Sequence, residues 1–372
     1  MNKTVKCTTA VNLANKSRIN QKFISFCLTS ALLSFPLITH ADSPYFSFKD
    51  GDGFKRFSVS IGVLHVMPQG KAQSIQANTA IKNGSVAEVG AIKSQTVKDN
   101  LKEGFKPSPI LQAALNTLDT IPGALSGSAT INGLESWDNA GTGLEADDVT
   151  TLGIMSNYFF TDHVSLEVKA GIPPKVDIQG KGQIYAPFSA DAKPLGGVAG
   201  NLELENDIFI TDLAKHGKVA EARAWTPAFE FQYHFGKTGV NKFRPYVGVG
   251  MMYAYFNDLE LNSNLEKDLI NAGHKIANIQ NGQAGAALEG TPSSANPKVK
   301  LDANDAFAPV VTAGFTYDFN DRWFGVGSVS YAHLTAEQTI TVTDASLGKL
   351  IEAKSDIEIN PILGYVGVGY RF

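Results

Sequence analysis

Few side chains in this sequence have the types and spacing that acid–base or metal chemistry requires. Seven histidines are present, and six of them lie beyond residue 41: His65, His163, His216, His234, His274 and His333. A general base needs a nucleophile or an acid within hydrogen-bonding reach, and no His-x-Ser pair accompanies His65 or His333. The sequence also lacks a His-Glu-x-x-His motif. We therefore expect no catalytic residue, no metal site and no cofactor, and we expect these histidines to be structural.

The first 41 residues have the layout of a secretory signal peptide. They contain five basic residues and no acidic one, and an apolar run from Phe23 to Ile38 follows the basic part. The segment ends in Thr39-His40-Ala41, with small residues where a signal peptidase reads them. Cleavage after Ala41 would leave a chain of residues 42–372 with 27 basic and 36 acidic groups, a net charge of −9. Both cysteines would leave with the leader, so the remaining fold must form without disulfides.

Composition excludes several classes of protein. Only 18% of the residues are charged, whereas soluble chains average about 25%. The chain is neither a disordered acidic tail nor a polybasic protein, and we expect no nucleic-acid partner. No run of about 18 apolar residues is present, which argues against a membrane-spanning helix.

Alternation of apolar and polar residues predicts eight β-strands. The clearest one runs over 164–172, where Val164, Leu166 and Val168 alternate with Ser165, Glu167 and Lys169. The eight segments are 54–66, 149–160, 164–172, 225–235, 243–256, 306–319, 323–335 and 358–372. In the second segment, 149–160, and the seventh, 323–335, the alternation does not show which side chains face the interior of the sheet.

The connections between these strands alternate strictly between short and long. Three are short and rich in turn-forming residues: 161–163, 236–242 and 320–322. Four are long: 67–148, 173–224, 257–305 and 336–357. An even number of strands with short turns at one end and long loops at the other is the plan of outer-membrane β-barrels.

A lipocalin-like barrel with an apolar interior is the alternative closed barrel. Aromatic residues next to the short turns favour the membrane barrel, because they match an aromatic girdle at a membrane interface. These residues are Phe235, Phe243, Phe319, Trp323, Tyr370 and Phe372. Glycines on the opposite face of the strands fit the narrow interior of eight strands. We predict an all-β fold, an eight-stranded antiparallel transmembrane β-barrel with long external loops carrying short helices.

The C-terminal strand resembles the signal by which the barrel-assembly machinery recognises outer-membrane barrels. Its residues are Tyr365, Gly367, Tyr370 and the terminal Phe372. Three motifs resemble the OmpW family of outer-membrane proteins. They are Gly62-Val63-Leu64-His65-Val66-Met67-Pro68, Phe243-Arg244-Pro245-Tyr246-Val247-Gly248-Val249-Gly250 and Val366-Gly367-Val368-Gly369-Tyr370-Arg371-Phe372. This resemblance covers all eight strands but not the long loops. It implies an eight-stranded barrel, embedded in outer-membrane lipid, that admits small hydrophobic solutes and opens laterally into the bilayer.

The first three long loops are longer than the resemblance would lead one to expect. Apolar residues fall on one helical face over 109–118 and again over 264–279. Such helices either pack onto their own loops as a compact external cap, or form a hydrophobic lid over the barrel. Amphipathic stretches usually bury their own apolar face, which favours the cap.

Passage of apolar solutes requires an apolar path and a gate rather than an acid or a base. The apolar residues predicted to line the interior are Met155, Tyr246, Met252, Leu363 and Tyr365. The alternative is that they only fill a narrow barrel. The charged residues predicted to face inward nearer the short turns are Glu167, Lys169, Glu230, Arg244 and Arg371, which could pair into a floor that blocks ions and water.

Three functions remain open on the sequence. The first is passive passage of small hydrophobic molecules across the outer membrane. The second is a surface barrel whose long loops bind a partner, a phage or a toxin. The third, an outer-membrane lipid-modifying enzyme, is the least supported, because it needs a histidine beside a serine or an acid near the outer leaflet.

A gel-shift experiment tests the barrel prediction. A closed membrane barrel resists unfolding by detergent at room temperature, because its strands have no open edge. The purified protein should therefore migrate faster on a denaturing gel when unheated than after boiling. A single mobility for both samples would contradict the barrel.

Overall fold

The structure is a computed structural model, and it describes residues 55–372. The predicted signal peptide lies outside the described residues. None of the helices in the described part is both long and apolar enough to cross a membrane.

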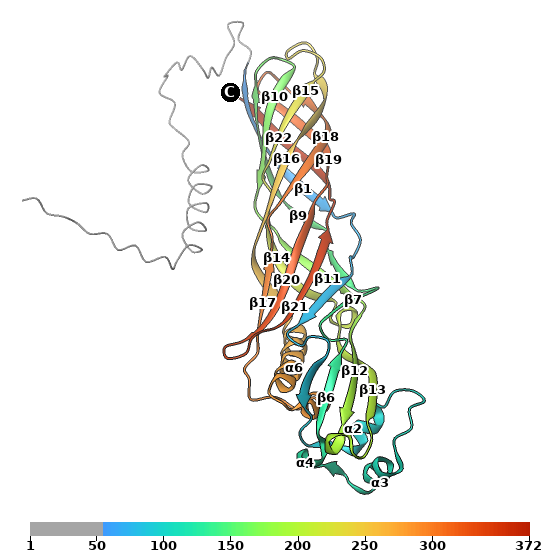
Figure 1. Cartoon of the computed structure of the whole chain (residues 1–372). Helices are drawn as coiled ribbons and strands as arrows, with labels where there is room; N and C mark the ends of the chain where they lie inside the picture. Colours follow the sequence, from blue (N-terminus) through green and yellow to red (C-terminus); the bar gives the residue numbers. More distant parts are fainter. Residues whose placement is uncertain (1–54) are drawn as a thin grey trace, which may run out of the picture. The chain divides into compact units, whose positions relative to one another are not determined.

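Eight antiparallel strands form a closed barrel, as predicted (Figure 1). Around the ring their order is β15, β10, β9, β1, β22, β19, β18, β16, and pairing of β16 with β15 closes it. The strands are β1 (Phe57–Met67), β9 (Val149–Phe159), β10 (Val164–Gly171), β15 (Ala228–His234), β16 (Phe243–Leu261), β18 (Ala306–Asp318), β19 (Trp323–Ala332) and β22 (Ile362–Arg371). Closure leaves no strand edge exposed to hydrocarbon, where an unpaired amide would be costly.

Side chains alternate between the two faces of the barrel wall. On β15, Glu230 and Gln232 are buried inside, whereas Phe229 and Phe231 are more than half exposed on the outside. The structure also assigns the two strands whose faces the sequence left open. β9 turns Met155 and Asn157 inward, and β19 turns Phe324, Val326, Ser328 and Ser330 inward.

Aromatic side chains form a continuous belt at the short-turn end. Trp323 contacts Tyr370 with ring centroids 5.1 Å apart, Tyr370 contacts Phe372 at 5.2 Å, and Phe372 contacts Phe57 at 5.6 Å. Phe235, Phe243 and Phe319 are about half exposed on the outer face near the same end. This arrangement is typical of the interfacial girdle of membrane barrels.

Inside the barrel, large aromatic side chains lie over glycines of neighbouring strands. A Cβ at Gly314 would be 2.5 Å from the Tyr246 ring, and one at Gly367 would be 2.5 Å from the Tyr365 hydroxyl. The ring of Phe324 occupies the corresponding space over Gly369. The interior of an eight-stranded barrel has little room, and alternating large and small residues fill it.

The long loops fold into sheets that the sequence analysis did not find. The first loop contains β2 (Ile75–Thr79), β3 (Ser85–Glu88), β4 (Ile92–Lys93), α2 (Ser94–Asp99), α3 (Pro109–Thr117), β5 (Thr120–Ile121), α4 (Gly123–Ser126), β6 (Ser128–Asn132), β7 (Ser136–Asn139) and β8 (Gly143–Ala146). The second contains β11 (Lys175–Lys181), β12 (Gln183–Lys193), η1 (Pro194–Gly197), β13 (Leu202–Asp212), α5 (Leu213–His216) and β14 (Lys218–Trp225). The third and fourth contain α6 (Ser263–Gln280), α7 (Ala284–Leu288), β17 (Lys298–Ala303), β20 (Thr335–Asp344) and β21 (Gly348–Glu358).

We call residues 67–148, 173–224, 257–305 and 336–357 together the cap. The barrel sheet continues into it, because β14 pairs with the end of β16, β11 pairs with β14, and β8 pairs with β11. A five-stranded sheet, β17-β20-β21-β2-β7, and a four-stranded sheet, β13-β12-β6-β3, complete it. In β12, buried and exposed positions alternate along the strand. This pattern is weak in the sequence, because the buried residues are mostly alanines and the strand contains Pro187.

Both predicted helices form, and each buries its apolar face in the cap. α3 buries Leu111 and Leu115, and α6 buries Leu265, Leu269 and Ile276 among other residues. These side chains join a single apolar cluster with residues of β6, β12 and β13. The helices therefore belong to a packed cap, as the compact alternative predicted, but they pack against segments of several loops rather than each on its own loop.

The glycine–aromatic packing leads to a test on one strand. Gly314→Val would push the Tyr246 ring out of its position, and overpacking of this kind costs about 1–3 kcal/mol. The urea midpoint of the refolded barrel should fall accordingly. Ala313→Val is the matched control, because Ala313 is exposed on the outer face of the same strand. Equal midpoints for the two variants would contradict this packing.

Candidate functional site

Two arginines close the interior at the short-turn end of the barrel. Arg244 donates to the Thr238 hydroxyl at 2.6 Å and pairs with Asp162 at 3.2 Å. Arg371 donates to Asp318 at 2.8 Å, and its guanidinium lies 4.4 Å from the centre of the Phe324 ring. Both arginines are almost completely buried, so their charges depend on these partners.

A second charged group lies farther inside, around Lys169. Its ammonium is 2.5 Å from Glu230 and 3.5 Å from Glu167, and it also donates to the hydroxyls of Thr312 (2.9 Å) and Ser330 (3.0 Å). The two carboxylates are buried and come from neighbouring strands in direct register. One cation thus links β10, β15, β18 and β19 across the interior.

Neutral polar side chains fill the space between the two charged groups. Asn157 donates to Gln232 at 2.8 Å, Ser165 lies 3.1 Å from His234 Nε2, and the Tyr365 hydroxyl donates to Ser60 at 3.1 Å. The cavity left among them measures about 10 Å³, close to the least that holds one water. We call this filled region, from Arg244 to Lys169, the plug.

Above the plug the interior becomes apolar. Buried side chains of five barrel strands and the segments that follow them form one cluster: Ala228, Met252, Ala254, Ala308, Val310, Ala332, Leu334 and Leu363. A cavity of about 70 Å³ follows on the cap side, which we call the barrel cavity. It is lined by Met252 and Leu363 together with Val66, Val149, Ala224, Phe256, Leu334 and Ile359, among others. Its lining also includes Asp147, Thr226 and Gln338, so the cavity is mostly rather than wholly apolar. Cavities with mainly apolar walls and a few polar groups can accept apolar guests.

The wall beside the barrel cavity has an interruption between β10 and β15. Their pairing ends at Lys169 and Ala228, and β11 and β14 resume it at Lys175 and Arg223. In the described structure no ladder pair joins 170–173 to 225–227. These stretches contain Pro173 and Pro227, and Pro174 follows at once; proline has no N–H for a ladder bond. Pro174 and Thr226 both line the barrel cavity, so this gap lies beside it.

All five residues predicted to line the interior are buried in it. Met155, Tyr246 and Tyr365 form one cluster with Phe324 and Val326 within the plug. Met252 and Leu363 lie above the plug and line the barrel cavity. That these residues contact a solute stays a prediction.

The five inward-facing charged residues come together in two groups rather than in one floor. Glu167, Lys169 and Glu230 form the inner group, and the two arginines form the outer one. The sequence analysis did not identify the arginines' partners, Asp162 and Asp318. The alternation in its strand places Asp318 on the inward face, so the sequence could have shown that its side chain points inward. Asp162 lies in a short turn, where no alternation shows the direction of a side chain.

Several histidines of the described part lie beside hydroxyl or acidic groups. His234 and Ser165 are close, but both are buried in the plug, and the His234 ring lies between Phe159 and Tyr246. In the cap, His216 Nε2 lies 3.1 Å from Asp268 and 3.2 Å from the Thr211 hydroxyl, so both contacts use the same ring nitrogen. His65 lies 2.9 Å from the Thr150 hydroxyl. No group of three metal-ligating side chains occurs among residues 55–372.

Sequence comparison decides the family. Outer membrane protein W of Vibrio cholerae serotype O1 is 30% identical over 236 residues, which span 63% of this chain and 79% of that relative. The chain belongs to the OmpW family. The OmpW family model itself matches residues 122–290. The protein is thus an OmpW-type barrel of the outer membrane.

Comparison with solved structures gives two further matches over most of this chain. The outer membrane protein OprG from Pseudomonas aeruginosa is 17% identical, with a TM-score of 0.43, and the match covers 85% of this chain and 95% of that one. The outer membrane protein AlkL, solved in lipid bilayers, is 16% identical, with a TM-score of 0.38 and coverage of 91% and 96%.

The pairing around Lys169 leads to a stability test. Lys169→Met would leave two carboxylates buried without their cation, and breaking a buried pair costs about 3–5 kcal/mol. The urea midpoint in lipid vesicles should fall clearly. Adding Glu230→Gln to Lys169→Met should recover part of the loss, because one carboxylate is then neutral. A double variant no more stable than Lys169→Met would argue against charge as the cause.

Proposed function

We propose that this OmpW-type barrel passes small hydrophobic molecules across the outer membrane. The observation that carries the proposal is the apolar barrel cavity directly above a filled polar plug. An apolar solute gains free energy by leaving water for such a cavity, whereas ions would lose their hydration there. The barrel needs no catalytic group for this function.

Because the plug is filled, a solute would leave more easily through the side of the barrel than along its axis. A solute that continued along the barrel axis would have to separate Lys169 from its two carboxylates and then Arg371 from Asp318. The gap between 170–173 and 225–227 offers a shorter route, because an opening between strands without ladder bonds there would lead from the barrel cavity to the lipid. Exposed apolar side chains such as Phe229 and Phe231 cover the outer face of the barrel, which favours lipid on that side.

An uptake experiment tests the path. Met252→Arg would put a charge into the apolar cavity, so proteoliposomes carrying it should take up a medium-chain alkane no faster than empty liposomes. Met252→Leu is the matched control and should retain the wild-type rate. If wild-type protein and empty liposomes gave the same rate, the transport proposal would fail. The function of the cap as a surface for a partner would then be the remaining candidate.

A backbone substitution tests the sideways exit separately. The Ala224 N–H donates to the Pro174 carbonyl at 3.0 Å. In an antiparallel pair the N–H of residue 174 would donate in return to the Ala224 carbonyl, but proline has no N–H. Pro174→Ala supplies that N–H and should narrow the gap. A net hydrogen bond is worth about 0.5–1.5 kcal/mol, so uptake should slow about two- to tenfold. Pro245→Ala, near the short-turn end of β16 and away from the barrel cavity, is the control and should leave uptake unchanged. Unchanged uptake in Pro174→Ala would argue against exit through this gap.

A further inference from the structure

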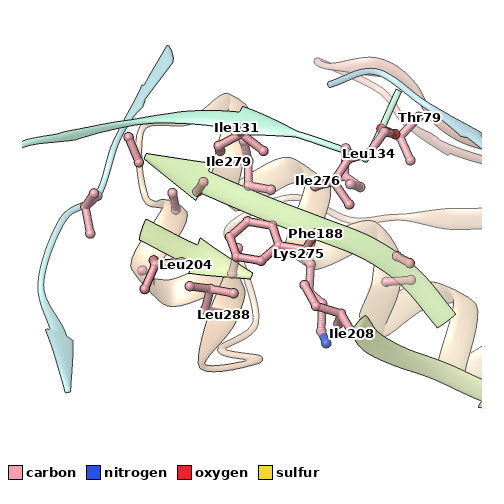
Figure 2. A pocket seen from close by; sticks show the side chains of 18 of the residues that line it. Thr79, Ile131, Leu134, Phe188, Leu204, Ile208, Lys275, Ile276, Ile279 and Leu288 are labelled. Atoms are coloured by element: carbon pink, nitrogen blue, oxygen red, sulfur yellow. The ribbon is translucent and has the colours of Figure 1, made fainter. Parts of the chain in front are cut away.

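The cap contains a second apolar cavity of its own, which we call the cap cavity. It measures about 110 Å³ and lies between the four-stranded sheet β13-β12-β6-β3 and the helices α6 and α7. Figure 2 shows Ile131, Phe188 and Leu204 of the sheet and Ile276 and Ile279 of α6 around it. The cap cavity and the barrel cavity share no lining residue.

The lining of the cap cavity is apolar apart from four side chains. Two of them, Thr79 and Ser126, already donate their hydroxyls to the carbonyls of Leu134 (2.7 Å) and Gly123 (3.0 Å). The other two are Lys275 and Trp137. A cavity of this size is comparable to the roughly 150 Å³ apolar cavity in another protein that binds benzene.

Lys275 is the charged group of the lining. Its stem runs along the cavity beside Phe188 and Ile208 (Figure 2). It takes part in none of the ion pairs or hydrogen bonds found within residues 55–372, and burial alone lowers the pKa of its ammonium. The side chain is half-buried, and its ammonium is not among the fully buried atoms, so the charged end lies at the edge of the cavity. It has no counter-charge in the described structure.

Trp137 adds a second donor without a partner. Its indole Nε1–H is buried and finds no acceptor in the described structure. A buried donor left unpaired costs about 1–3 kcal/mol, so an acceptor from outside the chain would stabilise it. Both unpaired polar groups of the lining are therefore hydrogen-bond donors, and one of them is cationic. The matching ligand is apolar over most of its length and carries an anionic acceptor.

We propose that the cap cavity binds a small aliphatic carboxylate, a short-chain fatty acid anion, with its carboxylate on Lys275. The aliphatic chain fills the cavity against the β12 and α6 side chains, and the carboxylate supplies the counter-charge that Lys275 lacks. The site goes beyond passage through the barrel, since it uses only cap residues and requires no opening of the wall.

Binding measurements on the full-length mature chain in lipid nanodiscs test the site. Pentanoate, 1-pentanol and pentylamine would be titrated calorimetrically, and the heats from empty nanodiscs subtracted to remove partition into lipid. We expect saturable binding of pentanoate, at least tenfold tighter than that of pentanol, and no saturable binding of pentylamine. Equal affinity for the three probes, or no saturable heat with pentanoate, would overturn the proposal.

Two variants with one matched control separate the charge from the cavity. Lys275→Met keeps an apolar stem and should abolish the preference for pentanoate over pentanol. Lys267→Met is the control, because Lys267 is exposed on the same helix and does not line the cavity. Ala272→Leu should fill part of the cavity and weaken the binding of both pentanoate and pentanol. Unchanged pentanoate binding in Lys275→Met would overturn the assignment of the carboxylate, and retained mobility on an unheated gel would show that the variants still fold.

Discussion

Hydrocarbon offers no hydrogen-bond partner to a peptide group, and the architecture of this protein follows from that constraint. Eight strands satisfy one another only if the ring closes, and here the pairing of β15 with β16 completes it. Closure fixes which residues meet across the interior, because each strand has a single register with each neighbour. The aromatic belt and the apolar outer face are then the surface that the ring presents to lipid.

A ring of eight strands has almost no free interior, so its function depends on how that interior is filled. Near the short turns, glycines receive aromatic rings and buried charges are paired, which leaves room for about one water. Toward the cap the same strands carry alanine, valine and leucine, and a cavity remains. One barrel thus combines a filled polar end with an apolar end that keeps a cavity. Prolines after β10 and before β15 interrupt the wall at the level where the change occurs.

The hydrogen-bonded sheet of the barrel continues into the cap. β16 runs 19 residues and pairs first with β15 and then with β14, so the barrel sheet continues into the cap. Away from lipid, open sheet edges are tolerated, and the additional sheets pack on α6 around an apolar core. A folded cap of this kind can hold a binding site that is separate from the barrel.

The sequence alone determined the eight barrel strands, the direction of most side chains and the positions of α3 and α6. These features are local: a side-chain period of two, a helical period, and the length of each connection are all visible along the chain. It also indicated that Lys169 and Glu230 face inward. Only the tertiary structure decided that Lys169 contacts Glu230, Thr312 and Ser330 from three other strands. The sequence could likewise not predict the cap sheets and the two cavities. These depend on strand register and on packing between segments far apart in the chain, and the local periodicity of the sequence contains no information on either.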